Sequence, residues 1–226
     1  MNTNDVYDPF QSAYRANHGI ETALLRVSSD ILSEMDNGRI VAMVLLDLSA
    51  AFDTVDHEIL LSRLNSFVGI DAVALEWCNS YLNRRPQYVC IGDELSNPVY
   101  MDYSVPQGSV LGPQWFPIYT LPIRRILVKH NISYHVYADD TQIYIDFSPS
   151  QDESVKAIRC LESCINDIRL WMRRNFLKLN EEKTEFLLFG SCHQLAKINI
   201  PFISIGWIWA IPYSSVFHMN RFIDSN

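Results

Sequence analysis

The first half of the chain contains one unbroken apolar run, residues 41–46, which ends abruptly at Asp47. A run without alternation is typical of a strand that is covered on both faces in the middle of a sheet. Two helices are predicted after it. Residues 56–69 place apolar side chains on one helical face before a terminating glycine, and residues 71–81 repeat this spacing after Asp71, which can cap the helix.

The second half contains further strands and the clearest helix. Two short strands are predicted at residues 87–91 and 95–100, on either side of a Gly-Asp turn. Residues 133–147 have apolar and aromatic arms around a polar turn, which indicates a β-hairpin. A capping box and a continuous apolar stripe predict a helix over residues 150–174, and residues 185–189 read as a last strand.

The order of these elements predicts an α+β fold. Strand, helices, loop with helix, hairpin, long helix and strand together fit an antiparallel sheet with helices packed on one face, in the ferredoxin-like split arrangement. In such a sheet Asp47 lies at a strand end, beside the hairpin tip that carries Asp139 and Asp140. The topology therefore predicts that three acids from distant parts of the chain become neighbours.

The amino-acid composition changes after residue 190, which predicts a domain boundary there. No Asp, Glu, Lys or Arg occurs between Lys197 and Arg221, and this stretch is rich in aromatic residues without a clean periodicity. We therefore predict one unit over residues 1–190 and a divergent, poorly specified hydrophobic tail over residues 191–226.

Composition narrows the class of protein. With 48% hydrophobic and 19% charged residues, the 226-residue chain can bury a large core, which excludes wholesale disorder. No apolar run approaches the roughly 18 residues of a membrane span, and residues 1–10 are too polar for a signal peptide. These patterns predict an intracellular protein, in the cytoplasm or nucleus, without membrane contact. The net charge of −8 counts against a nucleic-acid-binding surface, because Lys and Arg contact phosphates.

The five cysteines are scattered and have no Cys-x-x-Cys spacing. Cys160 and Cys164 lie one helical turn apart, and His193 directly follows Cys192, so the residue types allow a zinc site. The odd number and the wide spacing favour the alternative of reduced, half-buried thiols.

The candidate chemistry is concentrated in acidic residues. Asp139 and Asp140 are adjacent at the predicted hairpin turn, where each carboxylate raises the pKa of the other. They form either a solvated turn or a cation site, because hard oxygen ligands at a rigid turn suit Mg²⁺. Asp47 is either a helix-capping acid or a third ligand. Three carboxylates at one sheet edge can hold two Mg²⁺ ions roughly 4 Å apart, which supports in-line phosphoryl displacement.

Four motifs occur in a fixed order along the chain. The first, LLDLSAAFDTVDH at residues 45–57, is similar to the first catalytic motif of one family, the reverse transcriptases of LINE-type (non-LTR) retrotransposons. Residues 105–113, VPQGSVLGP, are similar to its loop that contacts the template and the incoming nucleotide. Residues 137–140, YADD, resemble its metal-binding hairpin, and residues 175–184 resemble the segment that follows. The match begins near residue 8, where the sequence is similar to the end of the fingers region.

The resemblance implies an RNA-directed DNA polymerase that adds dNTPs to the 3′-OH of a DNA primer along an RNA template. Asp47, Asp139 and Asp140 would be the catalytic residues and would hold two Mg²⁺ ions, with Mn²⁺ as a substitute. The further residues that the resemblance implies for contacts with the nucleotide or the template are Leu48, Phe52, Gln107, Gly108 and Lys183.

Each of these further residues has an implied role. The carbonyl of Leu48 would be an auxiliary metal ligand, and Phe52 would lie under the incoming sugar and exclude a ribose 2′-OH. Gln107 and Gly108 would border the templating base pair. Lys183 would approach the triphosphate and protonate the leaving pyrophosphate, or remain a solvated lysine at a strand edge.

Departures from the family pattern keep a second hypothesis open. The match describes a palm with partial fingers, and no thumb is recognisable after residue 190. Ser104 stands where glycine is usual, and Pro117 interrupts a stretch that is normally a smooth apolar helix. The chain is therefore either a reverse transcriptase domain, weak as a fragment, or a non-catalytic remnant that acts at most as a binding or structural domain.

Two readings from other classes fit less well. A nucleic-acid-binding module that stacks bases on sheet aromatics needs a basic sheet face, which the sequence lacks. A phosphohydrolase with Asp47 as nucleophile needs a second acid two residues later, where Ser49 stands.

Overall fold

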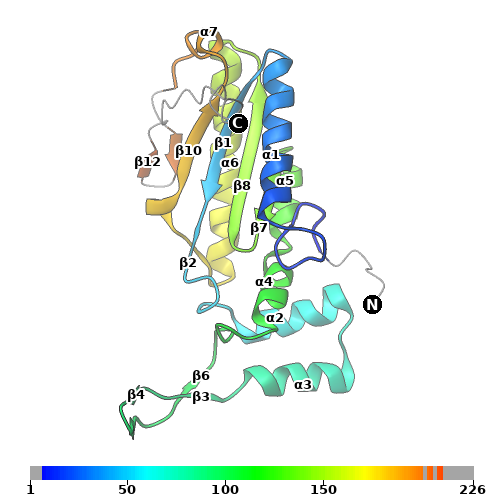
Figure 1. Cartoon of the computed structure of the whole chain (residues 1–226), viewed down its shortest axis with the longest axis vertical. Coiled ribbons are helices and arrows are strands. Elements are labelled where there is room, and N and C mark those ends of the chain that lie inside the picture. Colours follow the sequence, from blue (N-terminus) through cyan, green and yellow to red (C-terminus); the bar gives the residue numbers. More distant parts are fainter. Residues whose placement is uncertain (1–6, 201–202, 206–207, 211–226) are drawn as a thin grey trace, which may run out of the picture.

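A four-stranded antiparallel sheet forms the long axis of the molecule (Figure 1). The computed structural model describes residues 7–200 and the backbone of residues 203–205 and 208–210. The strand order is β10-β1-β8-β7, which is the order of the ferredoxin-like split arrangement. The strands are β1 (Ile40–Leu46), β7 (Ser133–Tyr137), β8 (Asp140–Phe147) and β10 (Glu185–Phe189).

Strand β1 is central, as its unbroken apolar sequence predicts. It pairs with β10 on one side and with β8 on the other. Ile40, Ala42 and Val44 are completely buried, so the strand contributes to the core along its whole length. Fully burying a side chain of the size of valine or isoleucine stabilises a fold by about 1.5–3 kcal/mol.

Different helices cover the two faces of the sheet. The predicted long helix is α6 (Gln151–Arg174), and it packs on the face that contains Ile40, Ala42 and Val44. The hydroxyl of Ser150 caps it by accepting the N–H of Glu153. The opposite face is covered by α1 (Ile20–Asp36), which is visible beside the sheet in Figure 1. The side chains buried on this second face are Val27, Ile31, Val41, Met43 and Tyr144.

The prediction that helices pack on only one face is therefore wrong, and α1 was not among the predicted elements. A central strand with apolar residues at every position presents them to both faces, so both faces require a cover. The alternate positions Val41 and Met43 are 1% and 4% exposed because α1 lies over them.

The segment between β1 and β7 is mainly helical. Asp56 begins the first of these helices, because its carboxylate accepts the N–H of Ile59 at 2.9 Å. The helices are α2 (His57–Arg63), a π-helical turn (Leu64–Val68), α3 (Ala72–Leu82), α4 (Gly112–Thr120) and α5 (Ile123–Lys129). Pro117 lies inside α4 and does not interrupt the helix, which ends at Thr120, so the expected interruption at this proline is absent.

Short paired strands complete the described structure. Two narrow ribbons project beyond α3 at one end of the molecule (Figure 1). They consist of β3 (Arg85–Gln87) with β6 (Val99–Met101) and β4 (Cys90–Ile91) with β5 (Glu94–Leu95). The other short elements are β2 (Leu48–Ser49), β9 (Lys178–Leu179), a 3-10 turn (Glu181–Lys183), α7 (Cys192–Leu195), β11 (Ile203–Ile205) and β12 (Ile208–Ala210).

The first ten residues of the predicted tail pack against the main body. Leu195, Ile198 and Ile200 contact the large core, and Asn199 exchanges two hydrogen bonds with the side chain of Gln151. Most of the remaining tail lies outside the described residues, so the predicted boundary at residue 190 stays a prediction. Among the described helices, none is long and apolar enough to cross a membrane.

Candidate active site

Asp139 and Asp140 lie at the tip of the hairpin formed by β7 and β8. Tyr137 and Asp140 are the last paired residues, so Ala138 and Asp139 form a two-residue loop. Ala138 has a φ of 59°, a left-handed conformation that a residue with a Cβ adopts only when its surroundings hold it there. It is also buried, at 8% exposure. The position of both acids therefore depends on a turn that is fixed from outside.

Asp47 follows β1 at the same end of the sheet. Leu46 pairs with Thr141, so Asp47 and Asp140 are the next residues along the two neighbouring strands. The side-chain amide of Asn180 donates to Asp47 Oδ2 at 2.9 Å, and Lys183 Nζ lies 3.9 Å from the same oxygen. The backbone N–H of Asn180 also donates to the Asp47 carbonyl, at 2.9 Å. The carboxylate is thus held by the segment that precedes β10.

The charges of the two other acids act on Asp140. Burial raises the pKa of Asp140 above its ordinary value, and the negative charges of Asp139 and then Asp47 add to this rise. Lys183 acts in the opposite direction. The strand register therefore places Asp47 beside Asp140, and Asp139 precedes Asp140 in the turn.

A cavity of about 460 Å³ lies beside these strand ends. Asp47, Asp140 and Lys183 line it together with Glu182 and Glu185. Within the described residues, no group of three or more His, Cys, Asp or Glu side chains is arranged to hold a metal ion. That result also gives no support to the zinc site that the cysteines allowed.

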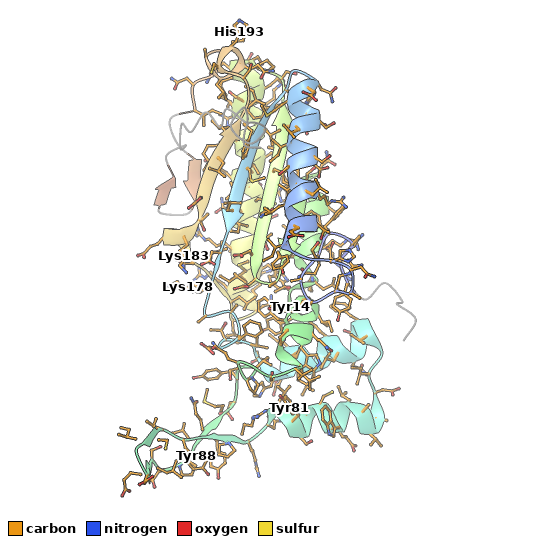
Figure 2. The ribbon with its side chains drawn as sticks, in the orientation of Figure 1. Tyr14, Tyr81, Tyr88, Lys178, Lys183 and His193 are labelled. Atoms are coloured by element: carbon orange, nitrogen blue, oxygen red, sulfur yellow. The ribbon has the colours of Figure 1, made fainter. Side chains whose placement is uncertain are left out.

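The other residues predicted for the site lie around this centre. Leu48 is buried in β2 opposite Leu179, and it lines a small cavity of about 30 Å³ together with Asp139. Phe52 is half-buried, with its ring centroid 5.2 Å from that of Phe116 in α4. Lys183 is exposed, at 72% of its side chain, and Figure 2 labels it near the lower end of the sheet.

The loop before α4 forms a separate region. Gln107 is exposed, and its amide lies 3.4 Å from a carboxylate oxygen of Asp53. Both residues line a cavity of about 590 Å³ that does not include any of the three central acids. Gly108 has a φ of 75°, which favours glycine at this position. The structure thus brings Asp47, Asp140 and Lys183 to one cavity, whereas Asp139 and Gln107 each line a different one.

Sequence reasoning missed three residues around the acids. Asn180 and Gln11 contact Asp47 and Ala138, respectively. Tyr14 lies near the hairpin tip, toward the opposite edge of the sheet from Lys183 (Figure 2). Burial, followed by the charge of Asp139, raises the pKa of Tyr14. All three stand in segments that resemble the retrotransposon family, and this resemblance was the only available signal.

The strand order, with helices on both faces of the sheet, is that of a palm-like α+β domain. The chain belongs to the family described as reverse transcriptase (RNA-dependent DNA polymerase), whose model matches residues 1–213. This membership confirms the resemblance stated from the four motifs.

Relatives with known names support this membership. The chain is 28% identical over 189 residues to the probable RNA-directed DNA polymerase from transposon BS of Drosophila melanogaster. It is 26% identical over 194 residues to the RNA-directed DNA polymerase from mobile element jockey of the same species. Each alignment covers 81% of this chain and 20% of the relative, so the chain spans about a fifth of the length of these relatives.

Solved structures support the fold independently. An apo telomerase from Candida tropicalis, truncated from its C-terminal domain, superposes with a TM-score of 0.56 at 14% identity, over 78% of this chain and 36% of that one. Telomerase from Candida albicans, in complex with a fragment of telomeric RNA, gives a TM-score of 0.56 at 12% identity, over 88% and 34% of the two chains. At this level of identity the likeness concerns the fold alone.

Proposed function

We propose that this chain is the palm-containing part of an RNA-directed DNA polymerase that adds dNTPs to the 3′-OH of a DNA primer along an RNA template. The observation that carries the proposal is the convergence of Asp47 with Asp139 and Asp140 at one end of the sheet. The proposed catalytic unit covers residues 1–190.

The ligand types of this donor set fit magnesium, although the described side chains are not grouped around a metal position. Three carboxylates supply hard oxygen atoms. Burial, followed by the charges of Asp139 and Asp47, raises the pKa of Asp140, and a divalent cation relieves the repulsion between these charges. We assign two Mg²⁺ ions, or Mn²⁺ in their place, to Asp47, Asp139 and Asp140, with the Leu48 carbonyl as an auxiliary ligand. When bound, such a pair activates the attacking oxygen and neutralises charge on the leaving group.

Other residues of the chain position the substrates. Phe52 lies under the incoming sugar, and its packing on Phe116 keeps the ring in place against a 2′-OH. Lys183 faces the cavity that Asp47 lines, which suits an approach to the triphosphate and proton donation to pyrophosphate. Gln107 and Gly108 border the template from the loop before α4.

A second candidate function is a domain of the same family without turnover. The net charge of −8 favours it, because a polymerase needs cationic side chains to hold the phosphates of template and primer.

Primer extension on poly(rA) with an oligo(dT) primer separates the two candidates. We expect weak extension with Mg²⁺ or Mn²⁺ that Asp139→Asn abolishes. The matched control is Asp146→Asn, which changes a half-buried aspartate at the other end of β8, where Arg39 pairs with it. Extension that survives Asp139→Asn would contradict the proposal, and a complete lack of extension by the wild-type chain would favour the second candidate.

A further inference from the structure

The segment that precedes α1 lies along strand β7. The N–H of Val136 donates to the carbonyl of Phe10 at 2.9 Å, and the N–H of Ser12 donates to the carbonyl of Val136 at 3.0 Å. Gln11 thereby forms a parallel bridge with Val136. Figure 1 shows this segment as the dark blue loop beside β7. The outer edge of the hairpin that carries the acids is thus paired with a distant part of the chain.

Side chains attach the same segment to β7 at two further points. The hydroxyl of Tyr134 donates to Asp8 Oδ2 at 2.7 Å, and Ser12 Oγ lies 2.9 Å from His135 Nε2. Asp8, Ser12 and His135 are all buried, so these contacts are shielded from water. They hold the middle of β7, several residues before the turn.

Gln11 makes a different contact, because it reaches the turn itself. Its side chain is buried, at 3% exposure, and its Oε1 accepts the N–H of Ala13 at 2.8 Å. The same oxygen accepts the N–H of Ala138 over a longer distance, 3.4 Å. Gln11, Leu48 and Asp139 line the same small cavity of about 30 Å³.

The Ala138 N–H needs such a partner. Ala138 lies beyond the last paired residues of the hairpin, so the strand ladder supplies no acceptor for it. A buried N–H without a partner costs free energy, and a left-handed alanine adds strain. The amide oxygen of Gln11 is buried and also accepts the N–H of Ala13, which holds it in place. This oxygen supplies the missing acceptor for the Ala138 N–H and helps to stabilise the strained alanine.

We propose that Gln11 is a positioning residue for the two acids of the hairpin: its amide oxygen holds the backbone of Ala138 in the conformation that presents Asp139 and Asp140 toward Asp47. This inference rests on the proposed function, because it assigns a role in the same metal-binding site. Gln11 acts through the backbone of Ala138 and does not touch the substrate.

The test compares variants of the full chain that remove different contacts. Gln11→Met keeps the size of the side chain and removes the acceptor, whereas Gln11→Glu keeps an acceptor oxygen. Ser12→Ala is the matched control, because it loosens the same segment at His135 and leaves the contact with Ala138 intact. The measurements are hydrogen exchange of the Ala138 amide by NMR, Mn²⁺ binding by electron paramagnetic resonance, and the thermal midpoint.

We expect Gln11→Met to accelerate exchange of the Ala138 amide about tenfold and to weaken Asp139-dependent Mn²⁺ binding by about tenfold. Gln11→Glu retains the protection of the amide. Ser12→Ala lowers the thermal midpoint and leaves both other quantities within about twofold. A merely structural role of Gln11 predicts that Gln11→Met and Ser12→Ala have equal effects on Mn²⁺ binding, and that result would overturn the inference.

If the proposed function is wrong, the Mn²⁺ measurements differ from those expected if only the role of Gln11 is wrong. If the wild-type chain and Asp139→Asn bind Mn²⁺ equally, the metal site itself is absent and the proposed function loses its basis. The exchange rate of the Ala138 amide then decides the role of Gln11 without the metal: unchanged exchange in Gln11→Met overturns that role, and accelerated exchange reversed in Gln11→Glu supports it.

Discussion

The two faces of the central sheet are built differently. On the α6 face, the strands and the helix join a large core that extends to α2, α4 and α5. The α6 side chains of Leu161 and Ile168 are completely buried in this core. On the α1 face, the buried cluster is small, and the outer side of the helix exposes Leu24 and Leu25 at 55% and 71%. The first face therefore supplies most of the stability, whereas the second mainly keeps β1 and β8 away from water.

The largest expected effect is on the α6 face. We expect Leu161→Ala to lower the free energy of unfolding by about 3–5 kcal/mol, because the surrounding core cannot close around the cavity. Ile31→Ala, in the small cluster on the α1 face, should cost only about 2 kcal/mol, since fewer buried side chains surround the site. Urea unfolding measures both values, and equal losses of unfolding free energy would contradict the proposed difference between the two faces.

The same contrast explains which elements the sequence predicts. In α6 the apolar positions form one continuous stripe, and the stripe faces the core. In α1 the buried Ala23, Val27 and Ile31 recur every four residues, but the exposed Leu24 and Leu25 add apolar positions on the outer side. These outer residues obscure the buried stripe, and the sequence analysis missed both the helix and the second cover of the sheet.

The candidate site also combines residues that the sequence predicts with residues that it does not. The meeting of Asp47 with the Asp139-Asp140 turn follows from the element order, because each acid lies directly beside a strongly patterned strand. The amide contacts of Gln11 and Asn180 come from irregular segments, where a single polar residue carries no periodic signal. The roles assigned to Leu48, Phe52, Gln107, Gly108 and Lys183 stay predictions.

An intermediate effect is expected where α1 is attached to the sheet by a polar contact. The hydroxyl of Tyr144 in β8 donates to Asp30 Oδ2 in α1 at 2.6 Å. Tyr144→Phe removes this bond and should cost about 1 kcal/mol in thermal or urea unfolding. Asp30→Asn provides the matched control, since an amide oxygen can still accept the bond. A loss in Asp30→Asn as large as that in Tyr144→Phe would contradict this account of the contact.

The pH dependence of stability should depend on the same hydrogen bond between Tyr144 and Asp30. Burial, followed by the hydrogen bond to Asp30, raises the pKa of Tyr144 above its ordinary value. A group whose pKa is raised in the folded state stabilises the fold fully below its unfolded pKa, which is about 10 for tyrosine, and this stability is lost as the pH rises further. We therefore expect the thermal midpoint of the wild-type chain to fall above pH ~10, and to fall less in Tyr144→Phe. Identical alkaline profiles would show that the α1 contact contributes nothing.

The smallest expected effect concerns an exposed contact between α5 and α6. Asp167 accepts hydrogen bonds from Lys129 Nζ and His130 Nε2, both at 2.8 Å. The bond from Lys129, followed by that from His130, lowers the pKa of Asp167. Because solvent screens this group, Asp167→Asn should cost no more than about 0.5 kcal/mol.

The direction of the pH effect at Asp167 is opposite to that at Tyr144. A carboxylate whose pKa is lowered in the folded state contributes its stability above the unfolded pKa of about 3.9, and this contribution is lost as the pH falls through the folded value. We expect the difference between wild type and Asp167→Asn in urea unfolding to be measurable at neutral pH and low salt. It should disappear in acid and shrink in 1 M NaCl, where the Debye length is about 3 Å. A loss comparable with that of Leu161→Ala would mean that surface charge, and not the buried core, dominates the stability of the α6 side.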